Sequence, residues 1–242
     1  IKQKLFYWAV DLGLQYEPYG KNGAWYEFKL KIAQKLILSK WKEALGGNLE
    51  LIASGSAALQ PRLARIFTAA GMTLVEGYGL TETSPVISVN DMRKNKFKIG
   101  SVGQIIDGVN VKIAKDGEIL CKGPNVMMGY YKDPEKTAEV MTNDYFHTGD
   151  IGEIDEQGFL KITDRKKEMF KTSGGKYISP QVIENIMKQS LFIEQIMVVG
   201  DGRKMPTALI QPNIEYVMKW LAENGTPKNS LEEACKEESL LK

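Results

Sequence analysis

The chain has 242 residues, 43% hydrophobic and 26% charged, which is typical of a globular protein with a sizeable core. A formal net charge of +2 argues against nucleic acid as the main partner. Cys121 and Cys235 lie far apart without metal-ligand spacing, and no apolar run approaches the about 20 residues that span a bilayer. We therefore expect a reducing compartment, with no disulfide framework, zinc site or transmembrane helix.

The first 45 residues are predicted to be mainly helical. Apolar residues recur at helical spacing over 5–12 and over 30–37, and a Pro- and Gly-containing loop at 18–23 separates the two stretches.

A strand–helix–strand unit is expected next. A strand at 48–53 is followed by a helix at 61–70, with Pro61 in its first turn and Gly71 at its exit, and by a short strand at 72–75. This order predicts a parallel strand pair, and the carboxyl ends of such strands are where α/β sheets bind ligands.

The middle of the chain predicts a small antiparallel sheet or barrel. One hairpin joins 109–113 to 118–121 through an Asp-Gly turn, and a second joins 152–155 to 159–163 through a Gln-Gly turn. Between them, Asp133 and Pro134 are expected to start a short helix.

After Asp164 the predicted hairpins give way to a mixture of helices and strands, so we place a domain boundary between 1–163 and 164–242. Ser179 and Pro180 are expected to open a helix, followed by strands at 195–199 and 207–210 and a helix at 214–224. The predicted fold class is multi-domain α/β, in which a parallel sheet and a small antiparallel sheet precede a small α+β domain.

The run 76–83 contains the first candidate ligand-binding residues. Tyr78 lies between Gly77 and Gly79, so its ring could stack on a purine that the glycines allow to approach. A turn tyrosine whose ring simply packs is the alternative. Glu82 next to Thr81 suits Mg²⁺ bridging to phosphate oxygens, although a solvated surface glutamate also explains it.

A second group of candidates surrounds the only histidine, His147, which by itself excludes a multi-histidine metal site within the chain. We expect His147 to position Asp150 through a shared loop. The carboxylate of Asp150 matches the two hydroxyls of a ribose, or Asp150 is a turn residue. Arg165 could bind ribose or phosphate, or form a surface salt bridge.

Two lysine-containing stretches follow different patterns. The stretch 171–176 lacks the first glycine and the final Ser/Thr of a phosphate-binding P-loop, but Ser173 and Gly174 leave room for a slender ligand arm. The basic stretch 94–98 is interpreted as a solvated loop.

Together these motifs resemble those of the adenylate-forming superfamily. The run 77–85 resembles its adenine and magnesium motif, while 145–152, 158–167 and 171–180 look like motifs of long-chain fatty acyl-CoA synthetases. The resemblance covers most of the chain, in the order that the family shows.

The resemblance implies roles at the matched positions. Tyr78 would stack on adenine, Glu82 would bind Mg²⁺ and Thr81 would contact phosphate. Further nucleotide contacts are implied at Gly55, Ser56, Ala57, Gly77, Gly79, Asp150 and Arg165, the last two at the ribose. Asp164 matches a hinge for a small lid domain. Positions near the CoA thiol and pantetheine channel are matched by Lys171, Ser173, Gly174 and Lys176, with Lys171 counted as catalytic.

The implied activity is ATP-dependent joining of a long-chain fatty acid to CoA through an acyl-adenylate, with ATP, Mg²⁺, the fatty acid and CoA as ligands. The family's Ser/Thr/Gly-rich phosphate loop and a C-terminal lysine have no match here, since Lys228 stands in the wrong context. A C-terminal fragment without activity of its own is therefore expected. Open alternatives are an adenylation domain that feeds a carrier protein and a non-catalytic nucleotide-binding module. The expected location is cytoplasmic, and a lipid substrate would suit peripheral membrane association.

Overall fold

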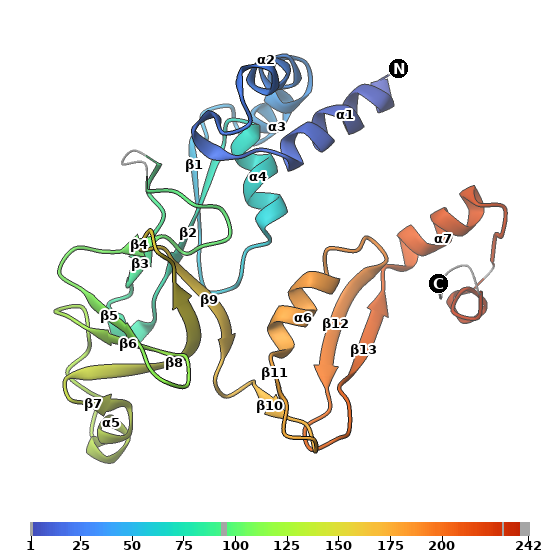
Figure 1. The fold of residues 1–242 in the computed structure, drawn as a ribbon. Helices are drawn as coiled ribbons and strands as arrows, with labels where there is room; N and C mark the ends of the chain where they lie inside the picture. The colour runs from blue at the N-terminus through green and yellow to red at the C-terminus, as the bar shows by residue number, and fades with distance from the viewer. Residues whose placement is uncertain (1, 93–95, 229, 238–242) are drawn as a thin grey trace. The chain divides into compact units, whose positions relative to one another are not determined.

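The computed structural model describes residues 2–92, 96–228 and 230–237, and its chain divides into two compact units, Ile1–Thr163 and Asp164–Lys242 (Figure 1). The predicted basic loop at 94–98 falls partly outside the described residues, at Lys94 and Asn95.

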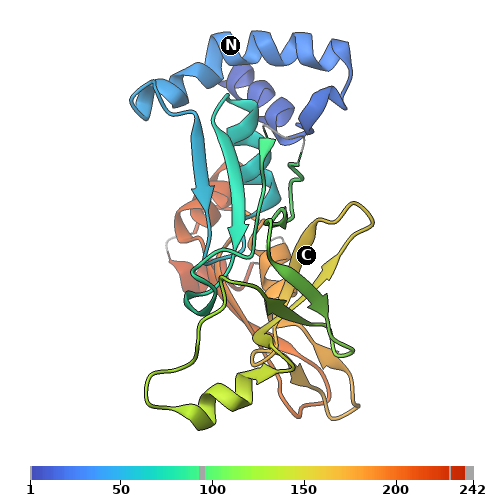
Figure 2. The ribbon, with the colours of Figure 1, turned by 90° about the vertical axis from the view of Figure 1, so that its left-hand side faces the viewer.

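The first unit begins with the predicted helices (Figure 2). These are α1 (Lys2–Leu14), α2 (Ala24–Ala33), the π-helical turn η2 (Gln34–Leu38) and α3 (Ser39–Ala44), with the short 3₁₀ turn η1 (Pro18–Gly20) in the predicted loop. Ala9, Leu12, Leu30 and Ala33 are buried with Met72 in one core cluster, which anchors the helices to the following sheet.

The predicted parallel pair is confirmed. β1 (Leu51–Ser54) pairs in parallel with β2 (Thr73–Tyr78), and α4 (Pro61–Ala69) makes the crossover. However, β2 does not end at Val75 as predicted. It continues to Tyr78 because Gly77 and Tyr78 pair with an unpredicted strand, β3 (Ser88–Val89), which pairs in turn with β4 (Gln104–Ile105).

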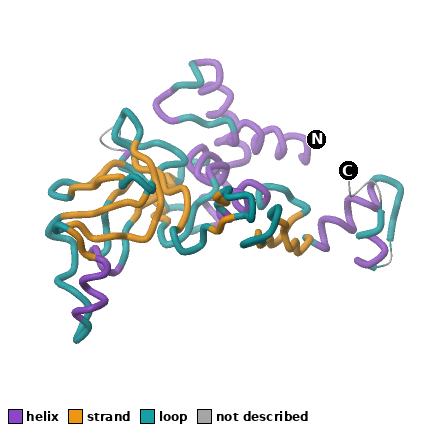
Figure 3. Tube along the Cα trace, turned by 60° about the horizontal axis from the view of Figure 1, so that its bottom comes forward, coloured by secondary structure: helices purple, strands orange, loops and turns teal. Residues whose placement is uncertain are grey.

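A five-stranded sheet completes the first unit (Figure 3). Both predicted hairpins are confirmed, and Asp133 caps the predicted helix by accepting the Lys136 backbone N–H at 3.0 Å. The strand Tyr145–Ile154 (β8) runs through the stretch that was predicted as a loop around His147. The elements are β5 (Asn110–Ile113), β6 (Glu118–Lys122), α5 (Pro134–Val140), β7 (Met141–Thr142), β8 (Tyr145–Ile154) and β9 (Leu160–Arg165), with strand order β5-β6-β8-β7 and β9 on β8.

The second unit has the predicted α+β pattern with two additions, the hairpin of β10 (Phe170–Lys171) and β11 (Tyr177–Ile178) and the short helix α8 (Leu231–Ala234). Ser179 occupies the predicted N-cap position, but its side chain makes no capping hydrogen bond. Within the described residues, no helix is long and apolar enough to cross a membrane. The other elements are α6 (Pro180–Met187), β12 (Ile193–Val199), β13 (Thr207–Pro212) and α7 (Ile214–Glu223).

Candidate functional site

Two predicted residues that are 72 positions apart in sequence meet in the first unit. The hydroxyl of Tyr78, at the end of β2, donates a hydrogen bond to Oδ2 of Asp150, on β8, at 2.7 Å. Burial, and next the charge of Asp150, raise the pKa of Tyr78 far above its ordinary value, so its hydroxyl remains a donor. The structure therefore joins an aromatic ring and a buried carboxylate at the carboxyl end of a parallel strand.

A bulge in β8 allows Asp150 to reach Tyr78. Glu118 of β6 pairs with Ile151 and Leu120 pairs with His147, so three residues of β8 lie opposite a single residue of β6 between these two pairs. Gly149 lies within the bulge at φ +74°, a left-handed conformation that favours glycine. Bulges beside functional sites commonly redirect a side chain, and here the redirected side chain is Asp150.

The carboxylate of Glu118 holds this bulge in place. It is 4% exposed, accepts the Gly149 backbone N–H at 3.0 Å through Oε1, and places Oε2 3.0 Å from Nδ1 of His147. His147 thus contacts Glu118 from within a strand, not from the predicted loop. Sequence reasoning missed Glu118, although its place after an Asp-Gly hairpin turn marked it as a strand residue.

A one-turn 3₁₀ helix, η3 (Thr81–Thr83), presents Thr81 and Glu82. The fully buried Thr83 stabilises the turn, because its hydroxyl accepts the Leu80 backbone N–H at 2.9 Å and lies 3.0 Å from the Leu80 carbonyl. Thr81 is exposed and Glu82 is half-buried. Sequence reasoning did not single out Thr83, since buried threonines have no pattern of their own.

Glu82 has a partner that the sequence did not indicate. The hydroxyl of Tyr130 donates to Oε1 of Glu82 at 2.9 Å, and burial followed by this contact raises the pKa of Tyr130. No cluster of three or more His, Cys, Asp or Glu side chains suited to a metal occurs among the described residues. Mg²⁺ is commonly bound by one or two carboxylates together with substrate phosphates, so a single glutamate in this turn fits it.

The loop after β1 is tied to β2 by Glu76. Oε1 of Glu76 accepts the Leu59 backbone N–H at 3.2 Å. Within the same loop, Ser56 has φ +68°, a left-handed conformation that costs free energy in residues with a side chain and often occurs at functional sites. The loop that contains Gly55, Ser56 and Ala57 therefore lies beside the strand that carries Tyr78.

Replacing Glu76 with glutamine is expected to stabilise the protein above neutral pH. Burial raises the pKa of Glu76 from 4.5 to about 7, so its stabilising contribution is full below pH 4.5 and declines as pH rises towards 7. Glutamine keeps the oxygen that accepts the Leu59 N–H but carries no charge. The free energy of unfolding at pH 8 should therefore rise by about 2 kcal/mol, less than the full pKa shift implies because the side chain is only half-buried.

Urea unfolding at pH 5 and pH 8 checks this prediction. The Glu76→Gln variant should match the parent more closely at pH 5 than at pH 8. An equal effect at both pH values would contradict it.

In the second unit, Asp164 is buried at 1% exposure, and its Oδ1 accepts the Arg165 backbone N–H at 2.6 Å. Burial raises the pKa of this carboxyl, while hydrogen bonds from the Arg165 backbone and the Ser179 side chain oppose the rise. Arg165 is exposed, with its guanidinium 3.7 Å from the carboxylate of Glu168.

The remaining candidates lie at the end of β10 and in the loop that joins it to β11. The Thr172 backbone N–H donates to the Lys176 carbonyl at 2.9 Å, and the Ser173 N–H donates to the Arg203 carbonyl at 2.9 Å. Nζ of Lys171 lies 5.2 Å from the ring centre of Tyr177. This hairpin thus carries Lys171, Ser173, Gly174 and Lys176 in the second unit, while Tyr78, Glu82 and Asp150 belong to the first.

Comparison with known proteins identifies the family. The model of the AMP-binding enzyme family matches residues 23–131, and the model of the AMP-binding enzyme C-terminal domain matches residues 168–228. The chain belongs to the AMP-binding enzyme family. The first match contains the loop 55–57 and the run 77–82, and the second contains the loop 171–176.

Curated relatives agree with this assignment. The long-chain fatty acid–CoA ligase FadD15 of Mycobacterium tuberculosis is 40% identical over 206 residues, which cover 85% of this chain and 34% of the relative. The peroxisomal long chain acyl-CoA synthetase 7 of Arabidopsis thaliana is 36% identical over 83% of this chain and 31% of its own length. The chain therefore spans about one third of these relatives.

Solved structures confirm the predicted fold class. The ATP-bound RpMatB-BxBclM chimera B3 superimposes with a TM-score of 0.63 and 28% identity, over 80% of this chain and 43% of that one. O-succinylbenzoate coenzyme A synthetase from Bacillus subtilis, solved with ATP and a magnesium ion, gives a TM-score of 0.61 at 25% identity, over 78% and 45%.

Proposed function

We propose that this chain is part of a ligase that activates a long-chain fatty acid with ATP and transfers it to CoA, and that it supplies much of the nucleotide site. The hydrogen bond between Tyr78 and Asp150 carries this proposal, because it joins an aromatic surface for a base to a carboxylate suited to a ribose. The 40% identity to a long-chain fatty acid–CoA ligase supports the choice of substrates.

In this proposal the Tyr78 ring stacks on adenine beside the backbone of Gly77 and Gly79. Asp150 accepts hydrogen bonds from the ribose hydroxyls through the oxygens of its carboxylate, and Arg165 contributes a cationic fork to ribose or phosphate. The loop with Gly55, Ser56 and Ala57 lines the other side of the base, consistent with its attachment to β2 through Glu76.

Glu82 and Thr81 act on the phosphates. Glu82 would hold Mg²⁺, which when bound neutralises phosphate charge, while the exposed Thr81 hydroxyl donates to a phosphate oxygen. The fatty acid carboxylate attacks the α-phosphorus of ATP, so an acyl-adenylate forms and pyrophosphate leaves. The CoA thiolate then attacks the acyl carbonyl carbon, the thioester forms, and AMP leaves.

The second unit would act as a lid that turns about Asp164 between the two steps. Asp164 suits a hinge because it is buried where the two compact units meet along the chain. Lys171 would act at the reacting groups as a fixed cation, and Ser173, Gly174 and Lys176 would line the path of the pantetheine arm of CoA.

Replacing Gly174 with leucine is expected to slow acyl transfer to CoA at least about tenfold while leaving adenylation nearly unchanged, because a side chain would fill the proposed path. A Cβ at Gly174 would meet only Thr172 Oγ1 at 3.9 Å, an ordinary contact, so Gly174→Ala should fold and work normally. Pyrophosphate exchange measures the first step, and single-turnover transfer from preformed acyl-adenylate measures the second.

Gly175→Ala is the matched control for turn strain. Gly175 has φ +83°, so alanine there should destabilise the loop and disturb both steps. Equal slowing of both steps by Gly174→Leu would contradict the proposed path for CoA.

Thioester formation tests the function as a whole. In the presence of Mg²⁺ the full-length protein should convert a long-chain fatty acid, ATP and CoA to acyl-CoA, AMP and pyrophosphate. The activity of the 242-residue chain alone should remain at background. Under this proposal the full-length protein is located in the cytoplasm. Transfer to a carrier protein in place of CoA would overturn the choice of acceptor.

A further inference from the structure

The outer face of α2 and η2 carries an exposed apolar stripe. Trp25 is 70% exposed and Phe28 54%, and Ile32 and Leu36 are also exposed. At about 100° per residue these four positions lie along one side of the helix. Tyr26, Leu30 and Ala33 lie on a different face of the helix, which is buried in the core of the first unit. The helix is therefore apolar on two faces, of which the core uses one.

Lysines border this stripe. Residues 21–42 contain six lysines and a single acidic residue, Glu27. Lys29 lies along one edge of the stripe, with Nζ 6.0 Å from the ring centre of Trp25, and helical spacing places Lys31 and Lys35 along the other edge. None of these three lysines forms an ion pair with another described residue, so their charges are available to an anionic partner.

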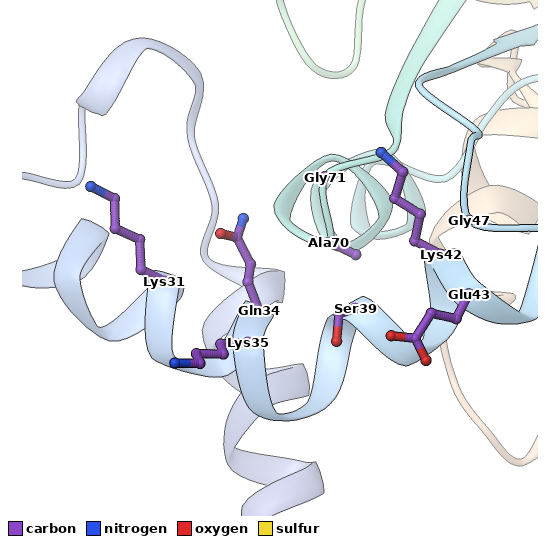
Figure 4. A pocket seen from close by; sticks show the side chains of 9 residues that line it. All are labelled: Lys31, Gln34, Lys35, Ser39, Lys42, Glu43, Gly47, Ala70 and Gly71. Carbon is purple, nitrogen blue, oxygen red and sulfur yellow. The ribbon is translucent and has the colours of Figure 1, made fainter.

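A cationic hollow of about 570 Å³ adjoins the same helix (Figure 4). Lys31, Lys35 and Lys42 line it from the α2–α3 helices, and Ala70 and Gly71 close it at the end of α4. Glu43 is the one acidic side chain in this lining. The hollow is large enough for an anionic headgroup next to the apolar stripe.

We propose that the outer face of α2 and η2, with its flanking lysines, is a contact surface for an anionic lipid bilayer. Aromatic rings at the polar–apolar boundary, an aliphatic stripe and lysines at its edges are the features by which helices lie in a membrane interface. Figure 1 shows α2 at the periphery of the first unit. The proposal does not depend on the ligase function.

Vesicle co-sedimentation of the full-length protein tests the proposal. The parent should bind vesicles of phosphatidylcholine mixed with phosphatidylglycerol, bind phosphatidylcholine alone much more weakly, and lose binding as salt rises. The double substitution Trp25→Ser, Phe28→Ser should lower the partition coefficient at least about tenfold. Lys31→Glu with Lys35→Glu should lower it by a similar factor on anionic vesicles only.

Two controls separate membrane contact from other effects. Tyr131→Ser removes an aromatic side chain that is 88% exposed outside the stripe and should leave binding unchanged. Trp25→Phe should bind like the parent but lose part of the fluorescence quenching that brominated lipid causes, since the quenched indole at the surface is gone.

Three results would overturn the proposal: no binding of the parent to anionic vesicles, equal binding by the Trp25→Ser, Phe28→Ser variant, or equal quenching in Trp25→Phe. If the double variant instead lowered the unfolding temperature markedly or changed the oligomeric mass without affecting binding, the stripe would be a packing surface within the protein or between its copies.

Discussion

Replacing Gly79 with alanine is expected to destabilise the full-length protein by at least about 3 kcal/mol, because a close approach of backbone leaves no room for a side chain. A Cβ at Gly79 would lie 1.6 Å from the Pro85 carbonyl oxygen and 2.7 Å from its carbon. The chain segments that carry Tyr78 and η3 would have to separate. Urea unfolding should show this as a clearly lower midpoint.

Gly77→Ala is the matched control, since its Cβ would meet the Ser88 carbonyl oxygen at 3.5 Å, an ordinary contact. It should retain a nearly normal midpoint. Equal midpoints for the two variants would contradict the argument that Gly79 is required by the packing of its own chain.

Replacing Asp150 with alanine is expected to weaken AMP binding about tenfold or more, since hydrogen bonds to a charged group contribute about 1.5–3 kcal/mol each. Calorimetry on the full-length protein measures the affinity, and circular dichroism confirms folding. Removal of Asp150 also leaves the Tyr78 hydroxyl without its 2.7 Å acceptor, so the effect needs a control for that bond.

Tyr78→Phe supplies this control, because phenylalanine keeps the ring and removes only the hydroxyl. AMP affinity should change little in this variant. In addition, 2′,3′-dideoxy-AMP should bind the parent and Asp150→Ala equally. A large loss for Tyr78→Phe, or unchanged AMP affinity in a folded Asp150→Ala, would contradict the ribose assignment.

Much of the fold follows from local sequence patterns. The parallel pair was predictable because Pro61 and Gly71 mark the start and end of its crossover helix. The hairpin of β5 and β6 was predictable because Asp-Gly between two apolar stretches is a strong signal for a tight hairpin turn. The family assignment also followed from motif order, which the two family models confirm.

The contacts within the site were not predictable, because they depend on long-range register. The extension of β2 to Tyr78 requires β3, a strand of two residues that is too short to have a periodicity. The bulge at Gly149 places Asp150 beside Tyr78, and the Glu118 carboxylate that holds it comes from 31 residues earlier in the chain.

The pairing of Glu82 with Tyr130 was missed for the same reason. The two residues are 48 positions apart, and Tyr130 precedes a helix whose capping by Asp133 already explained the local sequence. Because the helix cap accounts for the residues around Tyr130, the local sequence gives no indication that Tyr130 also contacts Glu82.

Exchange of labelled pyrophosphate into ATP by the full-length protein tests the central claim most directly, because it isolates formation of the acyl-adenylate. We predict exchange that requires a long-chain fatty acid and Mg²⁺ but not CoA. The exchange rate should fall about tenfold or more in Glu82→Gln, while Asp133→Asn, a substitution at the N-cap of α5, should leave it unchanged. Absence of exchange with every fatty acid in an otherwise folded, ATP-binding protein would contradict the account.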